Sequence, residues 1–215
     1  MDTGLVHHRL DAKDIPADIS EVYRYLGFSK PVVLNHLSQK NDAIPSETAE
    51  LVKKCISQVQ EILHPQAIYQ IFPLNEECLA SVLKSKDLSR RLEGCSHVIL
   101  LACTIGPQVD ALIRRWLKLD SATAVVMQAC GSMFIESYLD ILVNQLQEQL
   151  KKEGCTLKNR YSPGYGDLPL EIQKIVFSIL PCTQKTGLTL TEGLLMIPEK
   201  SVTAFIGIEN TNPRI

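Results

Sequence analysis

The feature that most constrains the fold of this sequence is an uninterrupted apolar run, HVILLAC, at His97–Cys103. Successive side chains of a strand point to opposite faces, so a run that is apolar at every position predicts a strand buried on both faces. Strand character also marks Ala67–Phe72, and, towards the C-terminus, Leu194–Ile197 and Ser201–Ile208. Pro198–Lys200 separates the last two segments as a turn, which predicts that they pair as an antiparallel hairpin.

Helical patterns are interspersed with these strands. Pro45–Leu63 is amphipathic, with an apolar stripe made of Leu51, Cys55, Val59 and Ile62. Further helices are expected over Ile19–Leu26, Asp87–Glu93, the segment that follows Pro107, Asp120–Lys152 and Leu170–Leu180. This mixture predicts an α+β fold in which helices pack on an antiparallel β-sheet. We expect a single domain over residues 1–215, with residues 1–20 as a candidate mobile N-terminal segment.

The composition limits the classes of function. A formal net charge of −2 argues against a nucleic-acid partner and gives no polybasic patch for a membrane surface. No apolar stretch approaches the ~18 residues of a membrane span, and the N-terminus lacks the apolar region of a secretory signal. These features predict a cytoplasmic protein without a membrane anchor.

Cysteine and histidine spacings indicate no metal site. The seven cysteines include no CxxC pair, and an odd, scattered set suits a reducing cytoplasm rather than a disulfide framework. The five histidines show neither HxxxH nor HExxH spacing. No base can be identified for Cys130, so we interpret it as a core residue and not as a nucleophile. We expect no intrinsic metal or corrinoid.

The long helix carries two acids on its apolar stripe. Ala122, Val126, Ala129 and Met133 step along one face, and the next positions on that face are Glu136 and Asp140. A buried carboxylate is costly unless it is paired or hydrogen-bonded, so one interpretation is an acid that faces a ligand. In the alternative interpretation the stripe reaches the surface there, or a lysine or arginine pairs with the acids.

The segment Arg160–Pro169 contains too many Pro and Gly residues for a regular element and predicts a shaped loop. An arginine before a Pro-Gly turn can clamp a carboxylate through two parallel hydrogen bonds. Gly164 would let the backbone approach a ligand closely, and Tyr165 would offer a flat ring with a polar tip. The alternative is an ordinary structural loop in which Arg160 forms a surface ion pair.

The sequence of this loop, RYSPGYGDLPL, resembles the RxxxGY signature of the activation domain of cobalamin-dependent methionine synthase. The likeness continues through GLTLTEGLLMIPEKSVTAFIGI, residues 187–208, which is similar to the C-terminal sheet of that domain. RYLGF, IYQIFPL and MFIESYLD further resemble short standalone bacterial members of the family. The similarity covers most of the chain after about Glu21.

The resemblance implies that the chain binds S-adenosylmethionine. Arg160, Gly164 and Tyr165 match the signature positions, and Tyr161 and Pro163 lie between them. The arginine would hold the carboxylate of the methionine part of the ligand. No residue is expected to be catalytic, because the family's reaction takes place at cobalt.

Three further positions bear on the resemblance. Glu136 matches a glutamate that recurs in short members, where its charge would pair with the ligand's ammonium group or accept from a ribose hydroxyl. Full-length enzymes carry an acid shortly before the signature arginine, whereas here the nearest acid is Glu153, at a different spacing. Those enzymes also continue past the last strand to an aromatic ligand contact, whereas this sequence ends at Ile215 with no aromatic residue in ENTNPRI.

The sequence lacks the DxHxxG motif and the cysteine cluster of the family's cobalamin and homocysteine modules. We therefore expect a separately encoded reactivation module of a methyltransferase, which is not active alone. Its partner would be a corrinoid-binding methionine synthase subunit that carries the cobalamin, together with an electron-donor flavoprotein. The module would support reductive methylation of cob(II)alamin by positioning the methyl group of S-adenosylmethionine. The alternatives are an accessory subunit of another corrinoid methyltransferase, or a ligand-binding scaffold without methyl transfer.

Overall fold

The computed structural model of the chain describes residues 3–28 and 44–211. Contacts within the chain group it into two compact units. Unit 1 consists of Met1–Arg9, Gln66–Thr104 and Ile141–Ile215, and unit 2 of Leu10–Pro65 and Ile105–Asp140. The expectation of a single domain over residues 1–215 stays a prediction.

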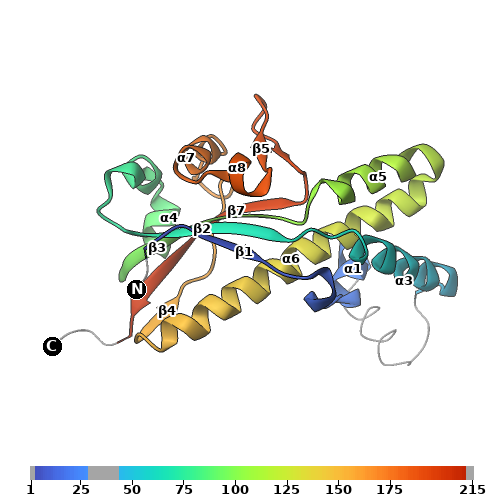
Figure 1. Cartoon of the computed structure of the whole chain (residues 1–215), viewed down its shortest axis with the longest axis horizontal. Helices are drawn as coiled ribbons and strands as arrows, with labels where there is room; N and C mark the ends of the chain where they lie inside the picture. The colour runs from blue at the N-terminus through green and yellow to red at the C-terminus, as the bar shows by residue number, and fades with distance from the viewer. Residues whose placement is uncertain (1–2, 29–43, 212–215) are drawn as a thin grey trace. The chain divides into compact units, whose positions relative to one another are not determined.

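Unit 1 is built on a five-stranded sheet of order β1-β2-β3-β7-β4, in which every pairing is antiparallel (Figure 1). Its strands are β1 (Val6–Arg9), β2 (Gln66–Pro73), β3 (Cys95–Thr104), β7 (Ser201–Asn210) and β4 (Cys155–Leu157). The apolar run HVILLAC lies in β3, the central strand, which pairs with β2 on one side and β7 on the other. The predicted antiparallel sheet and its buried strand are therefore confirmed. The edge strand β1 was not predicted, because VHHR carries a single apolar residue.

The predicted hairpin between Leu194–Ile197 and Ser201–Ile208 is wrong. The strand β6 (Met196–Ile197) pairs with β5 (Thr189–Leu190) in a separate two-stranded sheet, while β7 joins the main sheet. Thr191 explains the difference, because its N–H donates to the Leu195 carbonyl at 2.9 Å and its hydroxyl accepts from the Leu195 N–H at 3.0 Å. These bonds close a turn between Thr191 and Leu195, before Pro198–Lys200 in the chain, so β6 pairs with β5 and not with β7.

The core of unit 1 lies between one face of the sheet and three short helices (Figure 1). The sheet contributes Ile68, Leu100 and Phe205, each at most 1% exposed. Side chains from the covering segments complete the core, among them Leu88, Ile172 and Cys182. The covering helices are α4 (Lys86–Arg91), α7 (Ile172–Ile179) and α8 (Cys182–Thr186), and the 3-10 turns η2 (Glu77–Leu79) and η3 (Val82–Lys84) lie between β2 and α4.

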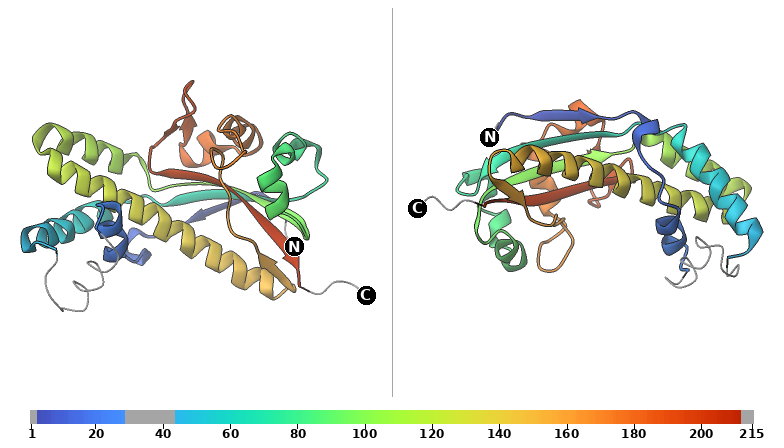
Figure 2. Two further views of the ribbon diagram at one scale, coloured as in Figure 1. Left: turned by 180° about the vertical axis from the view of Figure 1, so that it is seen from behind. Right: turned by 90° about the horizontal axis from the view of Figure 1, so that it is seen from below.

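The opposite face of the sheet is crossed by the end of the long helix α6 (Ser121–Lys151) (Figure 2). Within unit 1, the Gln147 side-chain oxygen accepts from the Leu157 N–H at 2.8 Å and from the Thr156 hydroxyl at 3.2 Å. These bonds attach the helix to β4. By length and composition alone α6 could cross a membrane, but 61% of its most apolar window is buried, as in the core helix of a globular protein.

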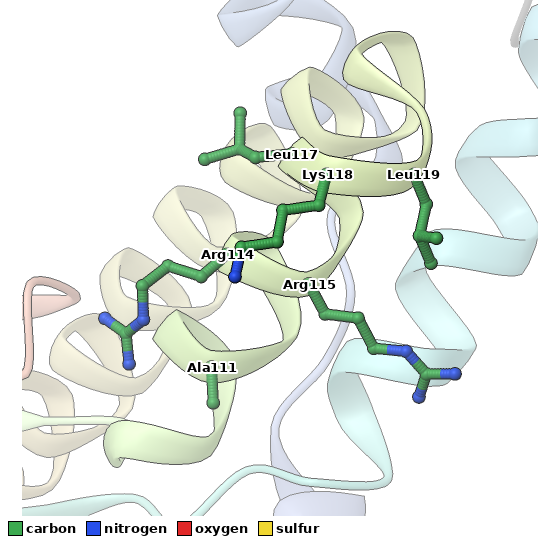
Figure 3. Close-up of a pocket in the computed structure, with 6 residues that line it drawn as sticks. All are labelled: Ala111, Arg114, Arg115, Leu117, Lys118 and Leu119. Carbon is green, nitrogen blue, oxygen red and sulfur yellow. The ribbon is translucent and has the colours of Figure 1, made fainter.

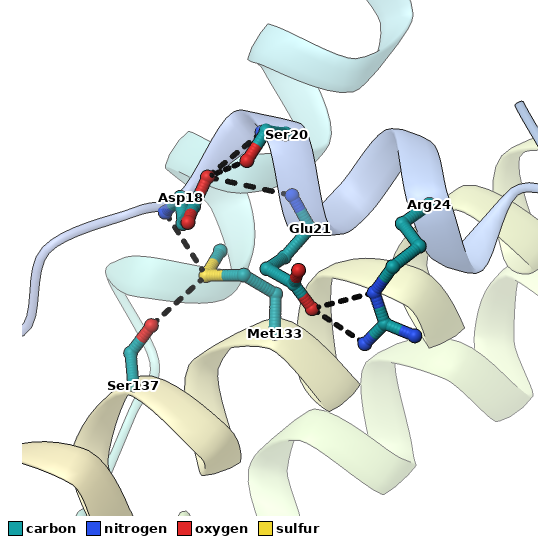
Figure 4. A network of polar contacts seen from close by, with 6 residues as sticks. All are labelled: Asp18, Ser20, Glu21, Arg24, Met133 and Ser137. Atoms are coloured by element: carbon teal, nitrogen blue, oxygen red, sulfur yellow. Dashed lines mark hydrogen bonds and ion pairs between the residues drawn. The ribbon is translucent and has the colours of Figure 1, made fainter. Parts of the chain in front are cut away.

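Unit 2 is helical. It contains α1 (Ile19–Tyr25), α3 (Ser46–Gln60), α5 (Pro107–Leu119), residues 121–140 of α6 and the short turn η1 (Ala12–Asp14). The Asp18 carboxylate starts α1 by accepting from the Ser20 and Glu21 N–H groups at 2.9 and 3.4 Å (Figure 4). The Asp18 N–H donates to the Met133 Sδ of α6 at 3.4 Å, so the same residue connects two helices.

The packing around β7 leads to a stability prediction. A Cβ added to Gly207 would lie 2.6 Å from the Cys95 Sγ and 2.9 Å from the Leu92 Cδ2, closer than van der Waals contact permits. We expect Gly207→Ala to lower the free energy of unfolding by ~1–3 kcal/mol, the usual cost of overpacking a core. Gly193→Ala is the matched control, because its nearest atom would be 3.9 Å away, and it should change stability by less than ~0.5 kcal/mol. Urea unfolding of both variants measures the difference, and equal losses would contradict the packing described.

Candidate functional site

The loop Arg160–Asp167 follows β4 and is attached directly to the central sheet. Tyr161 forms an isolated antiparallel bridge with Phe205 of β7. The Tyr161 N–H donates to the Phe205 carbonyl at 2.9 Å, and the Phe205 N–H donates back at 2.8 Å. This reciprocal pair anchors the start of the loop to a buried strand, so the residues that follow begin from a rigid base.

The Tyr161 side chain supports the loop from inside. It is 9% exposed, and the Arg91 guanidinium lies 4.5 Å from its ring centroid. Its hydroxyl donates to the Tyr165 carbonyl at 2.9 Å, which closes the loop on itself. Burial, and then the negative charge of Asp87, raise the pKa of Tyr161 above its usual value. The phenol therefore stays protonated and available as a donor.

Gly164 makes the sharp turn that the sequence predicted. Its φ is 92°, in the left-handed region that residues with a side chain rarely adopt. Its N–H donates to the Leu168 carbonyl at 2.9 Å, and the Leu168 N–H donates to the Tyr165 carbonyl at 3.0 Å. A Cβ at Gly164 would lie 3.3 Å from the Leu170 Cδ1, so backbone conformation and space both favour glycine there.

The predicted loop residues divide into an inner and an outer group. Tyr161 and Pro163 are buried and shape the loop from within. Arg160 is half-buried, Gly164 is exposed and Tyr165 is 66% exposed. The outer group thus consists of a half-buried arginine at the start of the loop and, at its turn, an exposed backbone and an exposed aromatic ring. Such a set can bind a carboxylate beside an apolar or aromatic moiety.

Asp167 is a residue of this loop whose role the sequence analysis missed. Its carboxylate accepts from the Ser85 hydroxyl and from the N–H groups of Lys86 and Asp87, at 2.8 and 3.2 Å for the latter two. These bonds, the Ser85 hydroxyl first, hold the pKa of Asp167 below its usual value. The Gly-Asp pair after Tyr165 was visible in the sequence, but its partners are distant along the chain.

A cavity of about 510 Å³ lies in the same unit as the loop. It adjoins the signature turn through Leu170, whose Cδ1 would lie 3.3 Å from a Cβ at Gly164. Gln173 also lines it and is 5% exposed, with a buried side-chain oxygen that has no hydrogen-bond partner in the described part of the chain. The remaining lining residues come from the β5–β6 hairpin and the turn after it: Thr191, Leu194, Leu195, Met196, Ile197 and Glu199.

Glu136 and Asp140 lie on α6 in unit 2. Asp140 is exposed, which agrees with the interpretation that the stripe reaches the surface there, and Glu136 is half-buried. Glu136 acts on Tyr25 of the same unit: burial and then the Glu136 charge raise the pKa of Tyr25. Its predicted part in ligand binding stays a prediction.

Other candidate chemistry is weaker. Burial raises the pKa of Cys130 to about 12, and this fully buried thiol is the core residue that the sequence predicted. Within residues 3–28 and 44–211, no group of three or more His, Cys, Asp or Glu side chains is placed to hold a metal ion. A shallow cavity of about 720 Å³ on α5 is lined by basic side chains, but Arg114 and Arg115 point away from each other and do not converge on one ligand (Figure 3).

The Tyr161 hydroxyl provides a test of the loop geometry. We expect Tyr161→Phe to lower the free energy of unfolding by ~0.5–1.5 kcal/mol, since the Tyr165 carbonyl loses its donor while the ring remains. Tyr165→Phe is the control, because that side chain is 66% exposed, and it should change stability by less than ~0.5 kcal/mol. Urea unfolding measures both, and an unchanged Tyr161→Phe protein would show that the hydroxyl does not hold the loop.

Comparison with known proteins bears on this site and fold. A family model described as the activation domain of vitamin B12 dependent methionine synthase matches residues 77–212, which include the whole loop. A solved structure of the MetH reactivation domain bound to AdoHcy shares the fold, with a TM-score of 0.70 and 17% identity over 99% of this chain and 80% of that chain. No curated protein sequence matches the chain. Because the family model spans more than half of the sequence, the chain belongs to the family of vitamin B12-dependent methionine synthase activation domains.

Proposed function

We propose that this chain binds S-adenosylmethionine beside the Arg160–Tyr165 loop and acts as the reactivation module of a cobalamin-dependent methionine synthase. The observation that carries the proposal is that the loop starts from the Tyr161–Phe205 bridge and leaves Arg160 half-buried and Gly164 and Tyr165 exposed. Membership of the activation-domain family supports this choice of ligand. The similar reactivation domain binds AdoHcy, which is what S-adenosylmethionine becomes once its methyl group has left.

Each residue of the loop has a distinct part in the proposed site. Arg160 holds the ligand carboxylate with two parallel hydrogen bonds. Gly164 lets the backbone approach the ligand, and Tyr165 packs its ring against it. Tyr161 and Pro163 act from inside by fixing the shape of the turn. On the family resemblance alone, Glu136 of unit 2 is proposed to pair with the ligand ammonium or to accept from a ribose hydroxyl.

The proposed reaction needs no acid, base or nucleophile from this chain. A corrinoid held by the partner would supply the nucleophile once the flavoprotein had provided one electron, and this chain would supply the bound methyl donor. The sulfonium of S-adenosylmethionine gives up its methyl group and leaves as a neutral thioether. This chain contributes binding and orientation, which can account for a large share of a rate enhancement.

The proposed partner is a corrinoid-binding methionine synthase subunit, with a flavoprotein as the electron donor and the cytoplasm as the compartment. Exposed apolar side chains close to the loop in unit 1 support a partner there. Tyr165 is 66% exposed, Leu195 67% and Ile197 49%, and the last two line the 510 Å³ cavity. Exposed apolar side chains that gather around a cavity, as Leu195 and Ile197 do, are typical of sites that another molecule covers.

Titration with S-adenosylmethionine tests the proposal. Removal of one partner of a desolvated charge pair costs roughly 2–5 kcal/mol, so Arg160→Ala should weaken binding about 30-fold or more. Arg160→Lys should recover only part of the affinity, because a lysine cannot form two parallel hydrogen bonds to a carboxylate. Gly164→Val should also weaken binding, since its φ of 92° and the nearby Leu170 leave little room for a side chain.

Arg115→Ala is the matched control, an exposed arginine of unit 2 that should bind as the wild type does. Circular dichroism confirms that each variant is folded, and calorimetry gives the dissociation constants. If folded Arg160→Ala binds as tightly as the wild type, the proposed site is wrong. If the wild type binds no S-adenosylmethionine at millimolar concentration, alone or with a corrinoid-binding methionine synthase subunit, a scaffold without methyl transfer is the better description.

A further inference from the structure

We infer that Asp167 is a positioning residue for the proposed ligand-binding turn, and that it acts together with Asp87 of α4. The inference rests on the proposed function, because it concerns the same turn. Asp167 does not have to touch the ligand. It connects the turn that carries Tyr165 to the start of a neighbouring helix and so sets the conformation in which the ligand is bound.

The connection runs in both directions. The Asp167 carboxylate accepts from the Ser85 hydroxyl and from the N–H groups of Lys86 and Asp87, the latter two at 2.8 and 3.2 Å. The Asp87 carboxylate in turn accepts from the Asp167 N–H at 3.2 Å. Loop and helix therefore exchange donors and acceptors, and neither can shift without breaking several hydrogen bonds that involve a charged group.

Gly166 shows how closely the turn fits this framework. A Cβ at Gly166 would collide with the Asp87 Oδ2 and with the Tyr161 hydroxyl, well inside van der Waals contact. The same Tyr161 hydroxyl donates to the Tyr165 carbonyl at 2.9 Å. Tyr161 thus holds the Tyr165 carbonyl, and the Asp87–Asp167 pair holds the backbone two residues further on.

This framework bears on affinity because the turn is ordered before a ligand arrives. A mobile turn would lose conformational entropy on binding, whereas a held turn does not. The hydrogen bonds that the Asp167 carboxylate accepts keep its pKa below the usual value, so the carboxylate is charged near neutral pH. Loss of that charge should loosen the turn without removing any group that touches the ligand.

Asp167→Asn tests the inference, and Asp120→Asn is its matched control. Asp120 starts α6 in unit 2 with the same bonding pattern: it accepts from the Thr123 hydroxyl and from the N–H groups of Ala122 and Thr123, at 3.1 and 3.2 Å for the latter two. Hydrogen bonds from these groups also lower its pKa, with the Thr123 hydroxyl as the first cause, as the Ser85 hydroxyl is for Asp167. The two variants thus remove equivalent carboxylates, one beside the turn and one in the other unit.

We expect both variants to lower the thermal midpoint, but only Asp167→Asn to weaken S-adenosylmethionine binding, by about tenfold. Calorimetric titration well below both midpoints separates affinity from stability. Gly166→Ala should weaken binding in the same way and serves as a second variant if Asp167→Asn does not fold.

Unchanged affinity in folded Asp167→Asn, or equal losses in both aspartate variants, would overturn the inference while the proposed function stands. A wild type that binds no S-adenosylmethionine at millimolar concentration, alone or with a corrinoid-binding methionine synthase subunit, overturns the proposed function, and the inference with it. Weaker binding confined to Asp167→Asn and Gly166→Ala supports both.

Discussion

The antiparallel pairing of β3 with β7 is the interaction on which the rest of unit 1 depends. Its register runs from Cys95 opposite Glu209 to Thr104 opposite Ser201 and joins a strand from the middle of the chain to one near its end. Leu100 lies opposite Phe205, and Phe205 forms the bridge to Tyr161. The start of the candidate ligand loop is therefore hydrogen-bonded to a central strand of the sheet, and this strand fixes its position.

The β3–β7 pairing also separates the parts of the fold that could be predicted from the part that could not, because it joins segments distant in the sequence. The strand β3 and the helices α3, α5 and α6 follow from local periodicity, which the sequence displays in full. The hairpin error arose because Pro198–Lys200 predicts a turn but does not say which strands meet across it. β7 is buried along most of its length and pairs with β3, the other long apolar strand, since that pairing buries more surface than the short β6 could offer.

At the site, the residues that could be predicted are those marked by turn-forming residues or by the family signature within the loop itself. The Pro and Gly content predicted the turn at Gly164, and the family signature marked Arg160 and Tyr165. The role of Asp167 could not be predicted, because its partner Ser85 lies 82 positions away and only the folded chain brings them together. Periodicity placed Glu136 and Asp140 on one stripe, but it could not show that one is half-buried and the other exposed.

The division of the loop into buried and exposed residues suits the proposed reaction. When the nucleophile belongs to a partner, the donor's methyl group has to be presented in one orientation while the surface around it stays open. Tyr161 and Asp167 meet the first requirement, because the Tyr161 hydroxyl holds the Tyr165 carbonyl and Asp167 bonds to the start of α4. The exposed outer group meets the second, because Tyr165 is 66% exposed. A site buried within the chain could bind the same ligand, but a corrin ring could not reach it.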